Sequence, residues 1–160
     1  MIAPLLLAVD FMNFTYPTNP CYKNVPVPAV MVKGSFSYFD KNMGAGFDLH
    51  VDSVKKGSLA PGTQQDVVII ACDFPIGGTA EAYVFSDRGN SAAPLGDVAS
   101  ANWGGDWGAG PDSIHVTFRN RYLYIDACKD DDCTTNIVTT YALKNGRLVK
   151  VYEKTRKNRS

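Results

Sequence analysis

The chain has 160 residues, 45% of them hydrophobic, which is enough for a single domain to bury its own core. Its 16 basic and 16 acidic side chains give a formal net charge of zero. This balance removes the electrostatic attraction on which nucleic-acid binding depends, so we expect no nucleic-acid partner.

The N-terminal residues 1–9 form an apolar stretch that is too short to span a bilayer. They lack the positively charged start of a complete secretion signal, but the polar, turn-rich segment after them resembles an export cleavage region. Residues 1–9 are therefore either the remnant of a signal peptide, which we favour, or a first strand. We expect no membrane span.

Turn residues recur along the chain and helical periodicity is almost absent. In segment 47–54, Phe47, Leu49, Val51 and Ser53 alternate with the remaining residues, a pattern typical of a half-buried strand. Segment 66–72 is a β-branched run that predicts burial on both faces. The segments predicted as strands are 12–16, 29–39, 47–54, 66–72, 79–87, 113–120, 121–128, 137–143 and 147–153.

Two features complete the fold prediction. The Asn145–Gly146 step predicts a tight hairpin, because both residues tolerate the positive φ that such a turn requires. Segment 93–102 is ambiguous, since a single helical turn is possible there. We predict one all-β domain over residues 10–153, an antiparallel sandwich or a strongly curled barrel, followed by a flexible basic tail at 154–160.

The four cysteines indicate two disulfides. None lies in a C-x-x-C pair, so neither a zinc ribbon nor a thioredoxin-type redox site is predicted. Cys128 and Cys133 enclose the short loop CKDDDC, and their closeness along the chain favours their pairing over the two other connectivities. Cys21 and Cys72 then form the second bridge. Two disulfides predict a secreted or periplasmic location.

Residues 57–87, GSLAPGTQQDVVIIACDFPIGGTAEAYVFSD, resemble a pattern in small secreted bacterial all-β proteins of uncharacterised function. In that pattern a G-D-L-x-G-D-G loop leads into a β-branched strand that ends in cysteine, then a GGT turn and an aromatic strand. The matching positions are Gly57, Leu59, Val67 to Ile70, Cys72, Gly77-Gly78-Thr79 and Tyr83-Val84-Phe85. The loop also resembles FG-GAP calcium loops, but Ser58 and residues 60–63 provide no carboxylates, so calcium binding is not implied. The resemblance implies an exported all-β domain and no activity.

Familiar catalytic machinery is missing from the sequence. There is no G-x-S-x-G motif, and the cysteines are expected in disulfides. The two histidines, His50 and His115, lie in alternating strands without the close spacing that would build a metal site. We therefore predict no catalytic residue, no metal and no cofactor.

The best candidate for a binding surface is the segment 102–115, NWGGDWGAGPDSIH. Its tryptophans either stack on a ligand or anchor the loop, and we expect Trp103 to be the anchor and Trp107 the more exposed ring. The candidate ligand-binding residues are Trp103, Asp106, Trp107, Asp112 and His115. In CKDDDC, residues 130–132 are interpreted as a solvated acidic turn rather than a calcium site.

These observations predict a non-enzymatic, exported binding or interaction protein of the bacterial cell envelope, with a protein or a glycan as partner. The alternative is a carbohydrate-active hydrolase that uses aspartates near the Trp/Gly-rich loop, and a third possibility is a purely structural component. Convergence of any two among Asp97, Asp106, Asp112 and His115 in one concave pocket would favour the hydrolase.

Overall fold

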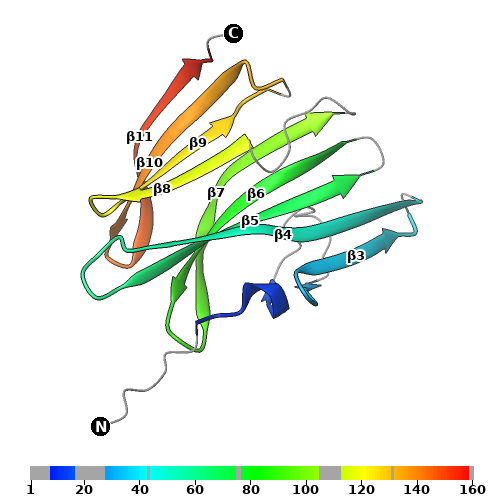
Figure 1. Ribbon diagram of the computed structural model, residues 1–160, viewed down its shortest axis with the longest axis horizontal. Coiled ribbons are helices and arrows are strands. Elements are labelled where there is room, and N and C mark those ends of the chain that lie inside the picture. Colours follow the sequence, from blue (N-terminus) through cyan, green and yellow to red (C-terminus); the bar gives the residue numbers. More distant parts are fainter. Residues whose placement is uncertain are drawn as a thin grey trace.

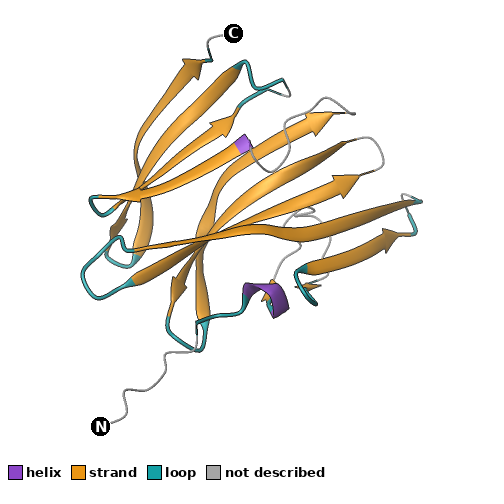
Figure 2. Cartoon of the chain, in the orientation of Figure 1, coloured by secondary structure: helices purple, strands orange, loops and turns teal. Residues whose placement is uncertain are grey.

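The computed structural model describes residues 8–16, 28–42, 44–74, 77–104, 113–130 and 132–158. Within these ranges the chain forms a short 3-10 helix, η1, and eleven strands, with no α-helix and no helix able to cross a membrane (Figure 2). The elements are η1 Phe11–Asn13, β1 Thr15–Tyr16, β2 Ala29–Val30, β3 Ser35–Asp40, β4 Ala45–Gly57, β5 Gln64–Phe74, β6 Gly77–Asp87, β7 Ala92–Gly104, β8 Ile114–Arg119, β9 Tyr122–Cys128, β10 Thr135–Lys144 and β11 Arg147–Lys157.

The strands form three antiparallel sheets. The two large sheets have the strand orders β3-β4-β5-β6-β7 and β11-β10-β9-β8, and β1 pairs with β2 in a small third sheet (Figure 1). The all-β, antiparallel prediction is confirmed. No sheet closes on itself, so the curled-barrel alternative is wrong.

Strand β5 is the centre of the fold because its side chains are buried on both faces, as its β-branched run predicts. Val67 and Ile69 face the four-stranded sheet and form one core with side chains of β6 to β9. Val68 and Ile70 face the opposite way and form a second core with the N-terminal segment. The five-stranded sheet is therefore the middle of three layers.

The N-terminal segment covers the middle sheet with a cluster of aromatic rings. Asp10 caps η1 by accepting a hydrogen bond from the backbone N–H of Met12 at 3.0 Å. The ring centroids of Phe11, Phe14 and Tyr16 lie 5.1 to 5.9 Å from that of Phe85 on β6. These contacts hold residues 8–16 against the sheet.

Two tight hairpins shape the four-stranded sheet. The turn at Asn145 and Gly146 has φ angles of 51° and 74°, which confirms the predicted hairpin between β10 and β11. Asn120 and Arg121 have φ angles of 51° and 64° and connect β8 to β9 in the same way. Positive φ at both central residues suits the right-handed twist of the strands that the turn joins.

Strand β4 departs from the alternation predicted for 47–54. Its register with β5 shifts between Val51 and Ser53, so Asp52 is an extra, bulged residue. The bulge turns Val54 to the same core as Phe47, whereas simple alternation places it on the polar side. A period-2 pattern cannot anticipate a bulge, because one inserted residue reverses all later side chains.

Two other segment predictions are corrected. Segment 29–39 is two strands rather than one, because Lys33 and Gly34 form a turn with φ angles of 52° and 80° between β2 and β3. Segment 93–102 lies within β7 and pairs with β6, so the helical turn is wrong there. Pairing along a full strand of β6 outweighs the weak local preference of this segment for a helical turn.

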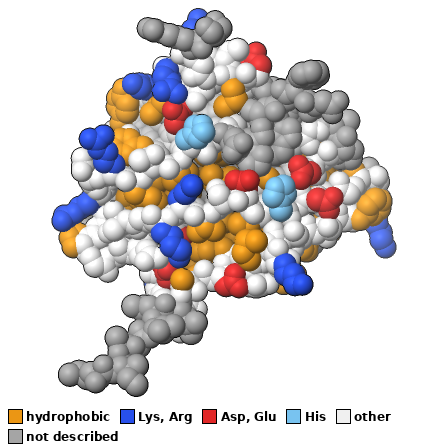
Figure 3. Space-filling model, in the orientation of Figure 1, with side chains coloured by type: hydrophobic (Ala, Val, Ile, Leu, Met, Phe, Trp, Pro, Cys, Tyr) orange, Lys and Arg blue, Asp and Glu red, His pale blue; other side chains and the backbone are white. Residues whose placement is uncertain are grey.

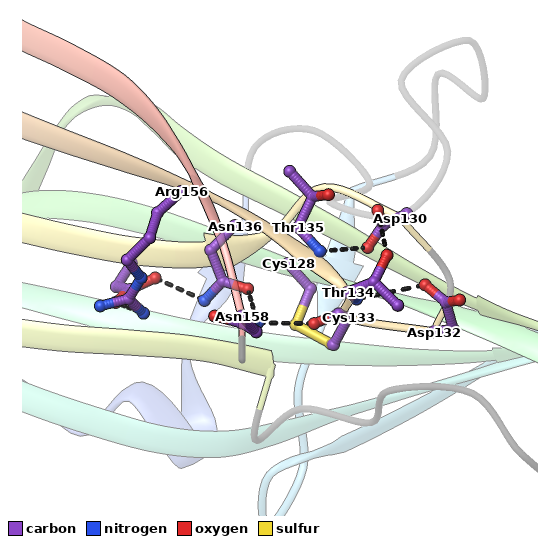
Figure 4. Close-up of a disulfide and its surroundings, with 10 residues drawn as sticks. Cys128, Asp130, Asp132, Cys133, Thr134, Thr135, Asn136, Arg156 and Asn158 are labelled. Atoms are coloured by element: carbon purple, nitrogen blue, oxygen red, sulfur yellow. Dashed lines mark hydrogen bonds and ion pairs between the residues drawn. A yellow bond between two sulfur atoms is a disulfide. The ribbon is translucent and has the colours of Figure 1, made fainter. Parts of the chain in front are cut away.

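The predicted flexible tail, residues 154–160, is replaced by regular structure over most of its length. Residues 154–157 continue β11 and pair with β10, from Val138↔Lys154 to Thr135↔Lys157. The Asn158 side chain then donates to the carbonyl of Cys133 at 2.5 Å and to Oδ1 of Asn136 at 2.6 Å (Figure 4). The end of β11 is therefore held by hydrogen bonds to β10 and to the preceding loop. Residues 159–160 lie outside the described residues.

One disulfide is present among the described residues. Cys128 and Cys133 are bonded with their Cα atoms 4.9 Å apart, as the short loop predicts (Figure 4). The second predicted bridge is not described, because Cys21 lies outside the described residues. Cys72 is buried at the end of β5, and no described cysteine is a free thiol.

Candidate functional site

Most of the predicted Trp/Gly-rich loop lies outside the described residues. This includes Asp106, Trp107 and Asp112, so their predicted roles stay predictions. The backbone of Trp103 pairs with Gly78 at the end of β7. The regular strand therefore extends into the segment that was predicted to be a loop.

His115 is the predicted site residue whose surroundings are described. It lies exposed on β8, opposite Asp126 of β9, and it borders one hollow with Arg119 and Tyr124 and another with Asp52 of β4. Asp97 of β7 lines neither hollow. His50 lines neither hollow; its Nδ1 lies 3.4 Å from a carboxylate oxygen of Asp73 on the five-stranded sheet.

The four hollows formed by described residues lack the carboxylate pair that glycoside hydrolysis requires. Four hollows formed by described residues contain one carboxylate each, namely Asp52, Asp87, Asp126 or Glu153. A glycosidase needs two carboxyl groups flanking the scissile bond. No group of three or more His, Cys, Asp and Glu side chains able to hold a metal occurs within the described ranges.

The acidic loop between Cys128 and Cys133 uses its carboxylates to hold its own backbone (Figure 4). Asp130 accepts hydrogen bonds from the backbone N–H of Thr135 and from the Thr134 hydroxyl, each at 2.9 Å. The first of these bonds is the main reason why the pKa of Asp130 lies below its usual value. Asp132 accepts from the N–H of Thr134 at 3.2 Å. Two of the three carboxylates are therefore turn-forming groups; Asp131 lies outside the described residues.

A different surface gathers aromatic side chains that the prediction did not use. It is the side of the four-stranded sheet turned away from the core, called here the outer face. The alternate residues of β9, Leu123 and Ile125, are buried on the other side. The register places on the outer face His115, Thr117, Arg119, Tyr122, Tyr124, Asp126, Asn136, Val138, Thr140, Tyr152, Lys154 and Arg156.

Three tyrosines dominate the outer face. Tyr124 of β9 and Tyr152 of β11 are both paired with Thr140 of β10, so they lie in one row across the strands. Strands two apart are separated by about 10 Å, which sets the spacing between the two tyrosines. Tyr122 lies beside Tyr124, with ring centroids 6.4 Å apart. Tyr152 is 53% exposed and Tyr122 is 40% exposed, so these rings are available to a partner.

The outer face is also hollowed and basic. A shallow hollow of about 590 Å³ lies between β8 and β10, with Tyr124, His115 and Arg119 at its border. The one outer-face carboxylate among the described residues, Asp126, is bound to Arg156 at 2.7 Å and to the Asn136 side-chain amide at 2.5 Å. The face therefore presents cations with little opposing negative charge. Figure 3 shows several Lys and Arg side chains over the part of the molecule that holds β8–β11.

A second concave surface lies between the two large sheets. It has a volume of about 290 Å³, an apolar floor that includes Val98 of β7 and Ile137 of β10, and a rim with the ion pair between Lys150 and Glu153 at 2.7 Å. The hydrogen bond to Glu153 raises the pKa of Lys150. Tyr141 crosses this space and donates to the carbonyl of Val98 at 3.0 Å. Side chains of the two sheets already contact each other across this space, so we interpret it as part of the packing between the sheets.

Polar groups are buried where β5 begins, and they organise the preceding loop. The Gln65 side-chain oxygen accepts from the backbone N–H of Leu59 at 2.7 Å and lies 3.4 Å from the Thr63 hydroxyl. The neighbouring Asp66 carboxyl is fully buried, with the Lys56 ammonium 3.5 Å away. Burial is the main cause that raises the pKa of Asp66, against the lowering effect of Lys56. These contacts belong to the fold and not to a ligand site.

Comparison with protein-family models, with curated proteins and with solved structures finds no match for this chain. The resemblance to small secreted bacterial proteins therefore stays a prediction. The geometry of the outer face is the basis for the function proposed below.

Proposed function

We propose that this chain is a non-enzymatic, exported binding protein of the bacterial cell envelope, and that its outer face binds a glycan. The observation that carries the proposal is the row of Tyr124 and Tyr152 on a face that no other part of the described chain covers. Aromatic rings held at fixed positions on a sheet offer flat apolar surfaces with a polar edge, which suits the faces and hydroxyls of sugar rings. Because a sheet is rigid, little conformational entropy is lost on binding.

Binding is better supported than hydrolysis. The outer face carries Asp126 as its described carboxylate, and that group is already engaged by Arg156 and Asn136. Glycoside hydrolysis needs one protonated carboxyl group as general acid and a second carboxylate as base or nucleophile. The hydrolase alternative depends on Asp106 and Asp112, which lie outside the described residues.

Export is supported by the Cys128–Cys133 bridge, because disulfides persist in oxidising compartments. The proposed Cys21–Cys72 bridge would close a much longer loop, contributing about 4 kcal/mol in the chain-entropy treatment. Non-reducing peptide mapping checks it: we expect a peptide pair containing Cys21 and Cys72. A free Cys21, or a pair that joins Cys72 to Cys128, would overturn this assignment.

The binding proposal is tested on a glycan array, followed by titration calorimetry with the best ligand. Tyr152→Ala is expected to lower affinity by about tenfold or more, as truncation of an aromatic hot spot does. The matched control is Phe39→Ala, because Phe39 is an aromatic ring of comparable exposure, 60%, on β3 of the other sheet. The proposal fails if the array shows no ligand, or if both variants lose the same affinity while keeping their melting temperatures.

A further inference from the structure

The zero net charge of this chain is the sum of two opposite halves. Residues 1–112 contain six basic and eleven acidic side chains, whereas residues 113–160 contain ten basic and five acidic ones. The formal charges are therefore −5 and +5. The second half builds the whole four-stranded sheet, and seven of its ten basic side chains, namely Arg119, Lys144, Arg147, Lys150, Lys154, Arg156 and Lys157, lie on strands of that sheet.

The basic side chains of the outer face lie beside the tyrosine row. Lys154 pairs with Val138 in the row next to Tyr152, and Arg119 pairs with Tyr122 in the row on the other side of Tyr124. Both side chains are exposed. Within the described ranges no carboxylate forms an ion pair with either of them, while Arg156 is held by Asp126. Arg119 and Lys154 are thus available to an incoming anion.

We infer that the outer face is selective for a carboxylated glycan, that is, an extended chain of sugar rings bearing uronate-type groups. This inference rests on the proposed glycan binding and adds the chemical class of the ligand. Sugar rings would stack on Tyr124 and Tyr152 while carboxylates pair with Arg119 and Lys154. Arg and Lys form charge-assisted hydrogen bonds with carboxylates that are stronger than those with neutral hydroxyls.

A carboxylated glycan fits this face better than a single-stranded nucleic acid. Successive bases stack on a continuous series of aromatic residues. The ring centroids of Tyr122 and Tyr124 lie 6.4 Å apart, but Tyr152 is separated from Tyr124 by a whole strand, about 10 Å, so the three rings do not form such a series. That separation matches the disaccharide repeat of an extended glycan.

The test uses the full chain and three probes: an oligogalacturonate, its carboxyl-reduced neutral counterpart of the same length, and oligo(dT). Titration calorimetry at low and moderate salt gives each affinity. We expect the oligogalacturonate to bind about tenfold more tightly than the reduced sugar, since two exposed ion pairs contribute modestly each. This preference is expected to shrink as salt rises.

Two charge variants locate the effect. Arg119→Gln and Lys154→Gln are each expected to weaken oligogalacturonate binding about two- to fivefold and to leave binding of the reduced sugar unchanged. Lys41→Gln, an exposed position in the turn between β3 and β4, is the matched control and is expected to change neither. Circular dichroism confirms that each variant is folded.

The outcomes separate the inference from the proposed function. Equal affinities for the two sugars would overturn the carboxylate preference and leave glycan binding intact. Binding of neither sugar would overturn both. Tighter binding of oligo(dT) would identify a nucleic-acid surface instead. A second copy of this chain could also bind the outer face, because the two halves of the sequence carry opposite charges. Analytical ultracentrifugation at several protein concentrations tests this. Dimerisation that Lys154→Gln abolishes would assign the outer face to self-association and overturn the inference.

Discussion

Each of the two large sheets packs one face against a shared core, and the two sheets differ in the exposure of their opposite faces. The centre of the five-stranded sheet is covered on both sides, since consecutive residues of β5 such as Val67 and Val68 are fully buried, although Phe39 on its edge strand β3 is 60% exposed. The four-stranded sheet is covered on one side, and its other side retains exposed Tyr122 and Tyr152. Packing explains the apolar residues of the central strand β5 in the first sheet. It does not explain the exposed Tyr122 and Tyr152 of the second sheet, which the proposed binding role would explain.

Two of the four edge strands of the large sheets carry features that oppose pairing with another chain. Edge strand β7 contains two register shifts and carries Pro94 and Gly96, and edge strand β11 carries five Lys or Arg side chains. Bulges, proline and lysine are the devices by which edge strands avoid pairing with other chains. Pairing with another chain along β7 or β11 is therefore disfavoured, which is consistent with the proposed binding on the outer face.

The largest expected effect on the free energy of unfolding concerns the buried strand β5 of the five-stranded sheet. Ile70→Ala removes a fully buried side chain of β5 and is expected to lower the free energy of unfolding by about 2–5 kcal/mol. Val151→Ala on β11, where the side chain is 41% exposed, is the control and is expected to change it by less than about 0.5 kcal/mol. Urea denaturation measures both. Similar losses for the two variants would mean that β11 is buried in solution, for example by a partner copy.

The next effect concerns the disulfide at the end of the four-stranded sheet. Replacing Cys128 and Cys133 together by Ser is expected to cost about 2 kcal/mol, because the bridge closes a short loop. Faster hydrogen exchange is expected first at Thr135 and Asn158, whose backbone N–H groups are bonded to this loop. Unchanged exchange at these residues would show that Asp130 and Asn158 hold the loop without the bridge.

A smaller effect is the pH dependence of stability that arises from Asp66 in the five-stranded sheet. Burial raises the pKa of Asp66, so the folded state holds this proton more strongly than the unfolded state does. Its contribution to stability is full below the unfolded pKa of about 3.9 and is lost as pH rises through the higher folded pKa.

Lys56 limits that loss, because its ammonium lies 3.5 Å from the Asp66 carboxylate. Lys56→Met is therefore expected to destabilise the protein at pH 7, by up to about 1 kcal/mol, and less at pH 3. Asp66→Asn is expected to remove this part of the pH dependence. Denaturation curves between pH 3 and pH 8 measure it; a Lys56→Met effect that is equal at all pH values would contradict the assignment.

The smallest expected effect lies on the outer face. Arg156→Ala breaks an ion pair with Asp126 whose partners are partly exposed, and is expected to cost less than about 1 kcal/mol. The variant leaves the Asp126 carboxylate unpaired on the basic face, where it repels an anionic glycan. The loss of binding free energy for such a glycan is therefore expected to exceed the loss of unfolding free energy. A loss of several kcal/mol instead would mean that this face is structural, which would remove the contrast between the two sheets.

Much of the fold was predictable because its signals are local. The β-branched run of β5 and the Asn145–Gly146 turn each depend on residues next to one another in the chain. The bulge at Asp52 and the break at Lys33–Gly34 were not predictable, because both depend on what the neighbouring strands require.

The candidate site was missed for a related reason. Tyr124 and Tyr152 are separated by many residues along the chain, and only the pairing of both with Thr140 makes them one row. One signal was nevertheless present in the sequence. The opposite charges of residues 1–112 and 113–160 indicate a basic half, which the total charge conceals.

The amino-acid sequence by itself determined the all-β class, the strand that is buried on both faces, the Asn–Gly hairpin and the short-loop disulfide. Each follows from the chemistry of adjacent residues: β-branching, tolerance of positive φ, and proximity of two thiols. Only the tertiary structure decided which faces are covered, that residues 154–157 are a paired strand instead of a tail, and that tyrosines and cations share one surface. Strand register and sheet packing bring distant residues together, and no local pattern specifies them.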